Sequence, residues 1–305
     1  MRDKTQQVIT IFGRLIRLVD RHLPILLILP AIVVVGLLIF YPMAYNFVIS
    51  FTNKSMFPRA IRFVGLANYA KLSTDQKYLN ALGNDLIYTF SSVPLTLVVG
   101  MAIALVLNRE KLVLRRLFRT LVIFPWVIPI VVVVMIWRWL LNPIYGLVSY
   151  LPVFMRVTNS PVLFFNTPFK SMASTILIMT WRGLPLITVI YLAALQTVPG
   201  EFYEVTQING ASWWQTLIYV TLPSLKQTIA VTAILRIIWT FNFFSLVWLL
   251  TGGGPVGATE ILPITAYLRG FFSYKMGEAA TVTITMFLIL LLFVFIYFRV
   301  SRQEA

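Results

Sequence analysis

The sequence predicts an all-α integral membrane protein that crosses the bilayer six times. The first observation behind this prediction is composition, since 59% of the 305 residues are hydrophobic and only 11% are charged. A soluble fold of this length could not bury so much apolar surface, so lipid must solvate much of the chain. The second observation is that six apolar runs each reach about 20 residues, the length that a helix needs to cross the hydrocarbon core.

Each predicted span follows from one of these runs. In chain order the runs cover roughly residues 23–51, 87–107, 117–141, 171–195, 228–250 and 279–298. The first run is longer than one crossing requires and contains Pro24, Pro30 and Pro42. We therefore expect an interfacial start followed by a kinked span. The run is too long for the apolar region of a cleavable signal peptide, and no small-residue cleavage site follows it.

The distribution of Lys and Arg favours cytoplasmic N- and C-termini. Five basic residues lie in segment 1–22 and five in the link 108–119, and six spans put both termini on one side. Basic segments stay preferentially in the cytoplasm, although the 52–83 loop also holds five basic residues. In a membrane protein the net charge of +15 indicates topology and contact with anionic lipid rather than binding of nucleic acid.

The predicted organisation follows from these spans and this orientation. It consists of a cytoplasmic basic segment 1–22, a first transmembrane helix 23–51, an extracytoplasmic loop 52–86, a core transmembrane domain 87–298 that contains a cytoplasmic loop 196–224, and a cytoplasmic tail 299–305.

The motifs of common enzyme classes are missing from the sequence. It has no cysteine, no P-loop, no zinc-protease or nucleophile-elbow motif, and no His/Cys cluster with metal-ligand spacing. We therefore expect no catalytic residue and no resident metal or cofactor. Asp85 and Glu278 fall at the ends of predicted spans, whereas ion-driven carriers usually keep carboxylates in the middle. An ion-coupled carrier and a membrane enzyme acting on lipid or glycan remain the alternatives.

The loop between the fourth and fifth runs is predicted to fold as a helix–turn–helix. After a Pro-Gly break, a short helix can begin with Glu201 and Glu204 in its first turns, where negative charge suits the helix dipole. Asn209-Gly210 is a turn dipeptide, because both residues tolerate positive φ. A second short helix over 211–219 presents apolar and aromatic side chains. Pro223 would lie just inside the start of the fifth span, where a missing N–H is tolerated.

The spacing in this loop resembles the EAA coupling loop of ATP-binding-cassette (ABC) import permeases. In that loop a Glu with two small residues is followed after three positions by a Gly, and nine positions later by a β-branched aliphatic, any residue, and Leu-Pro. The residues that fall on this spacing are Glu204, Gly210, Val220, Leu222 and Pro223. The chain departs from the pattern where Val205-Thr206 replaces Ala-Ala and Asn209 replaces Asp.

Other stretches extend the resemblance to nearly the full length of the first-type membrane subunit of carbohydrate ABC importers. They include 64–69, 124–129, 181–185, 192–196 and 250–255. The resemblance implies the type I ABC importer permease fold in a bacterial inner membrane. It implies an ATPase dimer that binds ATP and Mg²⁺, a second permease of different sequence, and an extracytoplasmic sugar-binding protein. The residues that it assigns to ATPase coupling are Glu204, Thr206, Asn209, Gly210, Ala211, Trp213, Leu222 and Pro223.

The substrate path is expected on the fourth and fifth spans. Arg138, Arg182 and Arg236 lie inside predicted spans, where an unpaired charge costs several kcal/mol. For Arg138, near a span end, snorkelling or capping of carbonyls is the favoured reading. The positions that match sugar contacts of the carbohydrate family are Met179, Arg182, Gly183, Leu186, Arg236, Thr240 and Phe243, and the chemistry of Trp181, Trp239 and Asn242 makes them plausible neighbours.

The sequence leaves the substrate open. Arginines where relatives of known specificity often carry amides raise the chance of an acidic sugar or a glycerol phosphate diester, but a neutral sugar is not excluded. The alternative to an ATP-driven importer is an ion-coupled secondary sugar carrier.

Overall fold

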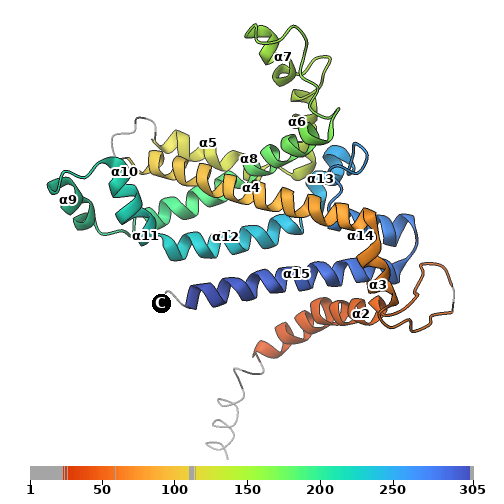
Figure 1. Ribbon diagram of the computed structural model, residues 1–305. Helices are drawn as coiled ribbons and strands as arrows, with labels where there is room; N and C mark the ends of the chain where they lie inside the picture. The colour runs from red at the N-terminus through yellow and green to blue at the C-terminus, as the bar shows by residue number, and fades with distance from the viewer. Residues whose placement is uncertain are drawn as a thin grey trace, which may run out of the picture.

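The computed structural model describes residues 23, 25, 27–58, 60–109, 113 and 115–302, and these residues fold into helices (Figure 1). The predicted basic segment 1–22, Pro24 and residues 303–305 lie outside the described residues. Within the described part the one β-type pairing is an isolated bridge between Thr52 and Phe63. The all-α prediction is therefore confirmed for this part of the chain.

The helices, with π-helical turns marked η, run in the following order. They are η1 (Gly36–Phe40), α2 (Tyr41–Ser50), α3 (Ala67–Thr74), α4 (Gln76–Asn108), α5 (Arg115–Val127), α6 (Ile130–Leu140), α7 (Leu147–Phe154), α8 (Pro168–Leu195), α9 (Gly200–Ile208), α10 (Trp213–Thr216), η2 (Leu217–Thr221), α11 (Leu222–Ser224), α12 (Lys226–Phe241), α13 (Phe244–Thr251), α14 (Leu262–Tyr267), η3 (Leu268–Phe272) and α15 (Met276–Arg302).

The number of membrane crossings agrees with the six that the sequence predicts. Four straight segments in the described residues are long and apolar enough to cross a bilayer, namely Leu27–Ser50, Gln76–Asn108, Pro168–Leu195 and Met276–Arg299. Two bent helix pairs, Arg116–Val127 with Ile130–Leu140 and Trp213–Ser224 with Lys226–Phe241, raise the count to six if each pair is one span. The first span contains the π-helical turn η1, directly before the Pro42 that was expected to kink it.

The third predicted span is not one straight helix. The prediction of a continuous helix over 117–141 is wrong, because α5 and α6 meet at an angle of 101°. Pro129 stands at the bend with extended backbone angles (φ −55°, ψ 141°). A proline has no N–H for the helical ladder and disfavours the helical conformation of the residue before it, so the helix breaks here.

The fifth predicted span is also interrupted. The run 228–250 was expected to form one helix, but α12 ends at Phe241 and α13 begins at Phe244. The side-chain amide of Asn242 donates to the carbonyl oxygen of Ile238 at 2.8 Å, which satisfies one of the carbonyls left free where α12 ends. After the break, α13 packs its buried side chains into the same core cluster as those of α6.

Helix α4 begins earlier than the second apolar run and carries a buried carboxylate. Asp75 caps its N-terminus by accepting from the backbone N–H groups of Lys77 and Tyr78. Asp85 therefore lies inside the helix and is fully buried, so the prediction that no span contains an acidic residue away from its ends is wrong. Its Oδ2 accepts from the backbone N–H of Leu262 at 3.2 Å, while Oδ1 has no partner.

The long helices α4, α8 and α12 pack side by side in the main bundle, and α5 packs along α8 (Figure 1). Helices α9 and α10 project from one end, where α8 finishes and α12 starts. The other end carries α3, α13 and α14. The core is apolar at both ends of α8, with a cluster around Ile178 and another around Tyr191.

An ionic cluster closes the end that carries α3 and α14. Arg269 of η3 pairs with Asp75 at 2.6 Å and lies 3.6 Å from Glu278, which also pairs with Lys71 at 2.6 Å. Burial of the Asp75 carboxyl opposes its ionisation. The N–H of Tyr78 and the guanidinium of Arg269 outweigh this effect, so the pKa of Asp75 lies below its ordinary value of 3.8.

Candidate functional site

The predicted helix–turn–helix is present, and a single glycine makes its turn. Helix α9 ends at Ile208, and Gly210 follows with φ +66°, a left-handed conformation that costs glycine little. Asn209 keeps a negative φ of −79°, so only one residue of the predicted turn dipeptide uses the left-handed region. Instead, the Asn209 side-chain amide donates to the carbonyl oxygen of Val205 at 2.9 Å and caps α9.

The second helix of the loop is shorter than predicted. Ser212 and Gln215 form a reciprocal capping box, so α10 begins at Trp213 rather than at 211. The chain then continues through η2 into α11, and Pro223 lies in the first turn of α11. The expectation that Pro223 opens the fifth span is wrong, because a 70° bend separates Trp213–Ser224 from α12. We call residues 200–224 the elbow.

The elbow has almost no core of its own. No residue of α9 or α10 is buried. Seven of its apolar side chains are at least half exposed, namely Phe202, Val205, Ile208, Trp213, Trp214, Ile218 and Tyr219. Of the predicted coupling residues, Glu204, Asn209, Gly210, Trp213 and Pro223 are exposed, while Thr206, Ala211 and Leu222 are half-buried. Leu222 packs against the cluster around Tyr191 and so ties the elbow to the bundle.

The predicted substrate-path residues gather around one cavity of about 310 Å³. It is lined by Trp126, Met179, Arg182, Gly183, Leu186, Arg236, Ile238, Trp239, Asn242 and Phe243. Thr240 does not line it; this side chain is fully buried and its hydroxyl has no partner. Trp181 also lies outside the lining, because its ring packs edge-on against Trp137 at 5.5 Å. The sequence had not pointed to Trp126, which α5 brings to the cavity.

Arg236 is the most buried cation of this cavity. Its residue surface is only 6% exposed, and neither Nε nor Nη2 has a hydrogen-bond partner. The side chain lies against Gly183 of α8, where a Cβ would lie 2.9 Å from Thr96 Cγ2 and even closer to the guanidinium. Because Gly183 has no side chain, the guanidinium of Arg236 can occupy this space.

Arg182 enters the same cavity from α8. Its Nη1 donates to the carbonyl oxygen of Ile128 at 3.1 Å, which lies at the bend between α5 and α6. Its guanidinium carbon lies 5.9 Å from the centre of the Phe243 ring, within the range of a cation–π contact. Arg138, in contrast, is exposed in the last turn of α6 and does not line the cavity.

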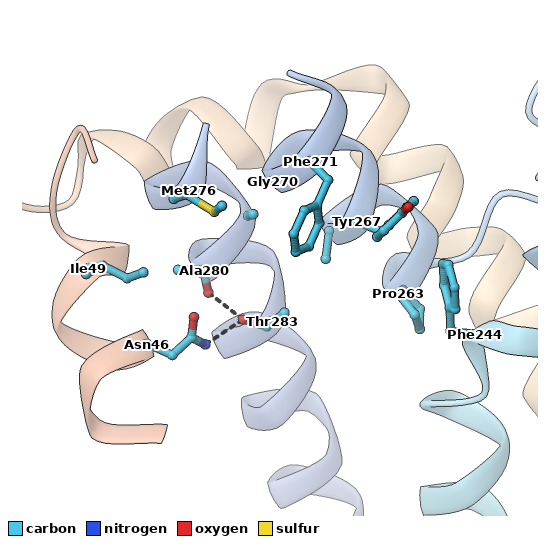
Figure 2. Close-up of a pocket in the computed structure, with 12 residues that line it drawn as sticks. Asn46, Ile49, Phe244, Pro263, Tyr267, Gly270, Phe271, Met276, Ala280 and Thr283 are labelled. Atoms are coloured by element: carbon cyan, nitrogen blue, oxygen red, sulfur yellow. Dashed lines mark hydrogen bonds between the residues drawn. The ribbon is translucent and has the colours of Figure 1, made fainter. Parts of the chain in front are cut away.

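A larger cavity of about 380 Å³ lies between α2, α14, η3 and α15 (Figure 2). Its lining is mostly apolar. The exception is a hydrogen-bonded pair in which Asn46 Nδ2 donates to Thr283 Oγ1 at 2.7 Å (Figure 2). No ionisable side chain apart from Tyr267 lines it, so it offers little to bind a polar solute. The arginine pocket, defined by the ten lining residues above, is the better candidate site.

The helical domain thus combines membrane-spanning segments with a cavity that holds two arginines and with an exposed elbow, an arrangement that suits a multi-pass membrane transport protein. Residues 76–303 match the family described as binding-protein-dependent transport system inner membrane component, and the chain belongs to this family. It is therefore a multi-pass inner-membrane subunit of a transport system, and the prediction that it is a permease rather than an enzyme is confirmed.

Named relatives agree with this assignment. The chain is 33% identical over 265 residues to the inner membrane ABC transporter permease protein YcjO of Escherichia coli, covering 86% of this chain and 88% of the relative. It is 33% identical over 248 residues to the trehalose/maltose transport system permease protein MalF of Thermococcus litoralis, covering 81% and 83%. It is 31% identical over 265 residues to the diacetylchitobiose uptake system permease protein DasB of Streptomyces coelicolor, covering 85% and 81%.

A solved structure supports the fold. The crystal structure of a bacterial ABC transporter involved in the import of the acidic polysaccharide alginate contains a chain that superposes with a TM-score of 0.79, covering 95% of this chain and 99% of that one. The sequences are 22% identical, so the likeness supports the ABC importer permease fold alone.

Proposed function

We propose that this chain is the permease subunit of an ATP-driven, binding-protein-dependent importer of sugars, either oligosaccharides or related glycans. The chain would form half of the translocation pathway and couple to its ATPase through the elbow. Relatives named for trehalose/maltose and diacetylchitobiose transport support the substrate class. The arginine pocket, with aromatic rings beside polar groups, has the chemistry that a sugar needs.

The exposed elbow is the observation that carries this proposal. Helix α9 exposes its apolar side chains together with Glu201 and Glu204, so neither lipid nor water is a favourable solvent for the whole surface. A protein partner that covers the apolar side chains and pairs with the carboxylates would be a favourable environment for the whole surface. Because the sequence has no P-loop, ATP and Mg²⁺ would be bound by that partner, an ATPase dimer.

The remaining assembly follows from the position of the elbow. If the elbow meets a cytoplasmic ATPase, both termini are cytoplasmic and the end that carries α3 and α14 faces outward. A sugar-binding protein would deliver its cargo there, and a second permease of different sequence would complete the pathway. Closure of the ATPases would move the elbow, and the pocket would face alternately outward and inward. Such an equilibrium is biased only by ligands that bind its two states differently.

Cross-linking tests the elbow directly, because the chain has no cysteine of its own. In the importer assembled with its ATPase, Trp214→Cys should cross-link to the ATPase, whereas Ser160→Cys should not. Glu204→Lys should leave membrane insertion intact but abolish sugar uptake and substrate-stimulated ATP hydrolysis. Glu201→Lys is the matched control, because both glutamates are exposed on α9. Normal uptake by Glu204→Lys, or no cross-link at Trp214→Cys, would contradict the proposal.

Buried Asp85 keeps the ion-coupled carrier as a second candidate. A carboxylate with an unpartnered oxygen inside a span is the kind of group that proton- or sodium-driven carriers use. Vesicles containing the chain without ATPase separate the two candidates. Sugar uptake driven by a proton or sodium gradient and lost in Asp85→Asn would favour the carrier. Uptake that requires ATP and the ATPase would exclude it.

A further inference from the structure

We propose that the arginine pocket binds a carboxylate of an acidic sugar, so that the transported substrate is a uronate-containing oligosaccharide. This inference rests on the proposed function and specifies its substrate class. It is carried by the charge balance of the pocket, by the burial of Arg236 without a counter-charge and by the contact that fixes its guanidinium.

The pocket has positive charge without an internal counter-charge. Two arginines line it, and no carboxylate does. In the described part of the chain, the acidic side chains are engaged elsewhere or lie on the elbow: Asp75 and Glu278 in the ionic cluster, Asp85 with the N–H of Leu262, Glu260 with the hydroxyl of Thr265, and Glu201 and Glu204 on α9. No hydrogen bond or ion pair joins any of them to Arg182 or Arg236.

A cation in this position needs a partner. Arg236 is 94% removed from solvent by the chain alone, and a charge buried without a counter-charge is strongly disfavoured. Water or sugar hydroxyls that reach the guanidinium through the cavity would leave its charge uncompensated. A carboxylate offers both acceptors and charge, and its two oxygens fit the forked donors of a guanidinium.

The surroundings hold Arg236 in place for such a partner. Gly183 lies against its guanidinium and Thr96 borders the same space, so the side chain has little freedom to turn away. Arg182 is held in turn by the carbonyl of Ile128 and keeps its other nitrogens available. Trp239 and Phe243 line the same cavity and offer apolar faces for a sugar ring. The cavity therefore has cationic and aromatic elements that together suit a uronate residue.

The first experiment measures the charge of the pocket without needing the substrate. Asn242→Cys places a thiol at an exposed position of the lining, and Ser160→Cys is the control on an exposed loop. In the assembled importer, an anionic methanethiosulfonate sulfonate should modify Asn242→Cys about tenfold faster than a cationic trimethylammonium analogue, after correction by the control. Adding Arg236→Gln or Arg182→Gln should lower that ratio. A ratio near one that neither substitution changes would overturn the proposal.

The second experiment compares sugars that differ only in charge. Digalacturonate and dimannuronate are each paired with their carboxyl-reduced disaccharide and supplied with the binding protein at saturation. The importer should take up at least one uronate about tenfold faster than its neutral counterpart, because one lost ionic contact is of this order. Arg236→Gln should remove this preference, Arg236→Lys should retain part of it, and the exposed Arg138→Gln should have no effect. Equal uptake of both members of each pair, or preference for the neutral ones, would overturn the proposal.

The two experiments also separate failure of this inference from failure of the proposed function. Import of neutral sugars alone would leave the importer proposal standing and refute the acidic substrate. If no sugar is imported although ATP is hydrolysed, the importer proposal fails, while the thiol-modification ratio still reports the charge of the pocket. If Arg236→Gln instead releases the second permease without changing substrate preference, the arginine pairs with that subunit and the inference is wrong.

Retention of the Trp214→Cys cross-link shows that each variant is assembled.

Discussion

The elbow and the arginine pocket reverse the usual distribution of side chains in opposite ways. The elbow exposes tryptophans and aliphatic residues, whereas the pocket holds the buried Arg236 and the half-buried Arg182 without a counter-charge. Each arrangement is unfavourable for the isolated chain and becomes favourable when another molecule completes it. The comparison separates a surface that is too apolar for water from an interior that is too charged for an apolar core.

The elbow directly connects the two helices that carry the arginines of the pocket. Helix α8 carries Arg182 and Gly183 and ends at Leu195, shortly before the elbow, and α12 starts just after the elbow and carries Arg236. A movement of the elbow would therefore act on both helices that contribute the arginines of the pocket. If the elbow couples the chain to an ATPase, substitutions in the elbow should impair coupling. Substitutions in the pocket should instead impair binding of the substrate.

The largest effect is expected for Gly210→Val in the elbow. A β-branched residue at φ +66° is strained by roughly 1–2 kcal/mol or more, so the turn should open and the coupling surface should be lost. Uptake and substrate-stimulated ATP hydrolysis should fall to background. Gly200→Val is the matched control, because Gly200 is at the start of α9 with open space around it and does not have a positive φ. Equal transport by the two variants would show that the turn is not needed for coupling.

A smaller effect is expected for Gly183→Ala in the pocket. The added methyl would collide with the Arg236 guanidinium and Thr96, and overpacking of this kind costs about 1–3 kcal/mol. Since 1.4 kcal/mol is a factor of ten, uptake should fall by roughly tenfold or more while the Trp214→Cys cross-link stays unchanged. Ser174→Ala, on the same helix and away from the pocket lining, serves as the comparison. Wild-type uptake by Gly183→Ala would mean that the position of Arg236 is unimportant.

The smallest effect is expected for Asp75→Asn, which lies outside both regions. Asparagine can still cap α4, but the ion pair with Arg269 is lost at a cost of about 1 kcal/mol, or roughly 2–4 °C in melting temperature. Because the pKa of Asp75 is lowered in the folded protein, its contribution is present above pH 3.8 and disappears as pH falls through the folded pKa. The difference in melting temperature between wild type and variant should therefore be present at pH 7 and vanish well below pH 3.8. Transport should be unchanged.

Local sequence rules predicted the elbow well. A glycine after a short acidic helix determines the turn, and α9 lies between Pro199 and Asn209 as the prediction of a break and a turn required. The second helix was placed less accurately, because Ser212 and Gln215 cap each other and move its start. The role of the elbow in coupling stays a prediction.

The pocket could be predicted only in part. The resemblance to carbohydrate permeases pointed to Arg182, Gly183 and Arg236. The spacing of these three residues in the sequence does not show that Gly183 leaves space for Arg236. Nor could it show that Trp181 points to Trp137 instead of the cavity, while Trp126 lines it. These contacts join residues more than 40 positions apart in the chain, so they depend on how the helices pack.

The sequence by itself determined the number of spans, the all-α class and the elbow turn. Hydrocarbon thickness sets the length of an apolar run, and the backbone freedom of a single glycine sets a turn, so both can be read locally. Only the tertiary structure decided the 101° bend at Pro129, the break at Asn242, the burial of Asp85 and the meeting of Arg236 with Gly183. In each of these cases the energy comes from groups on different helices, and a side chain's burial or partner is defined only when those helices are packed together.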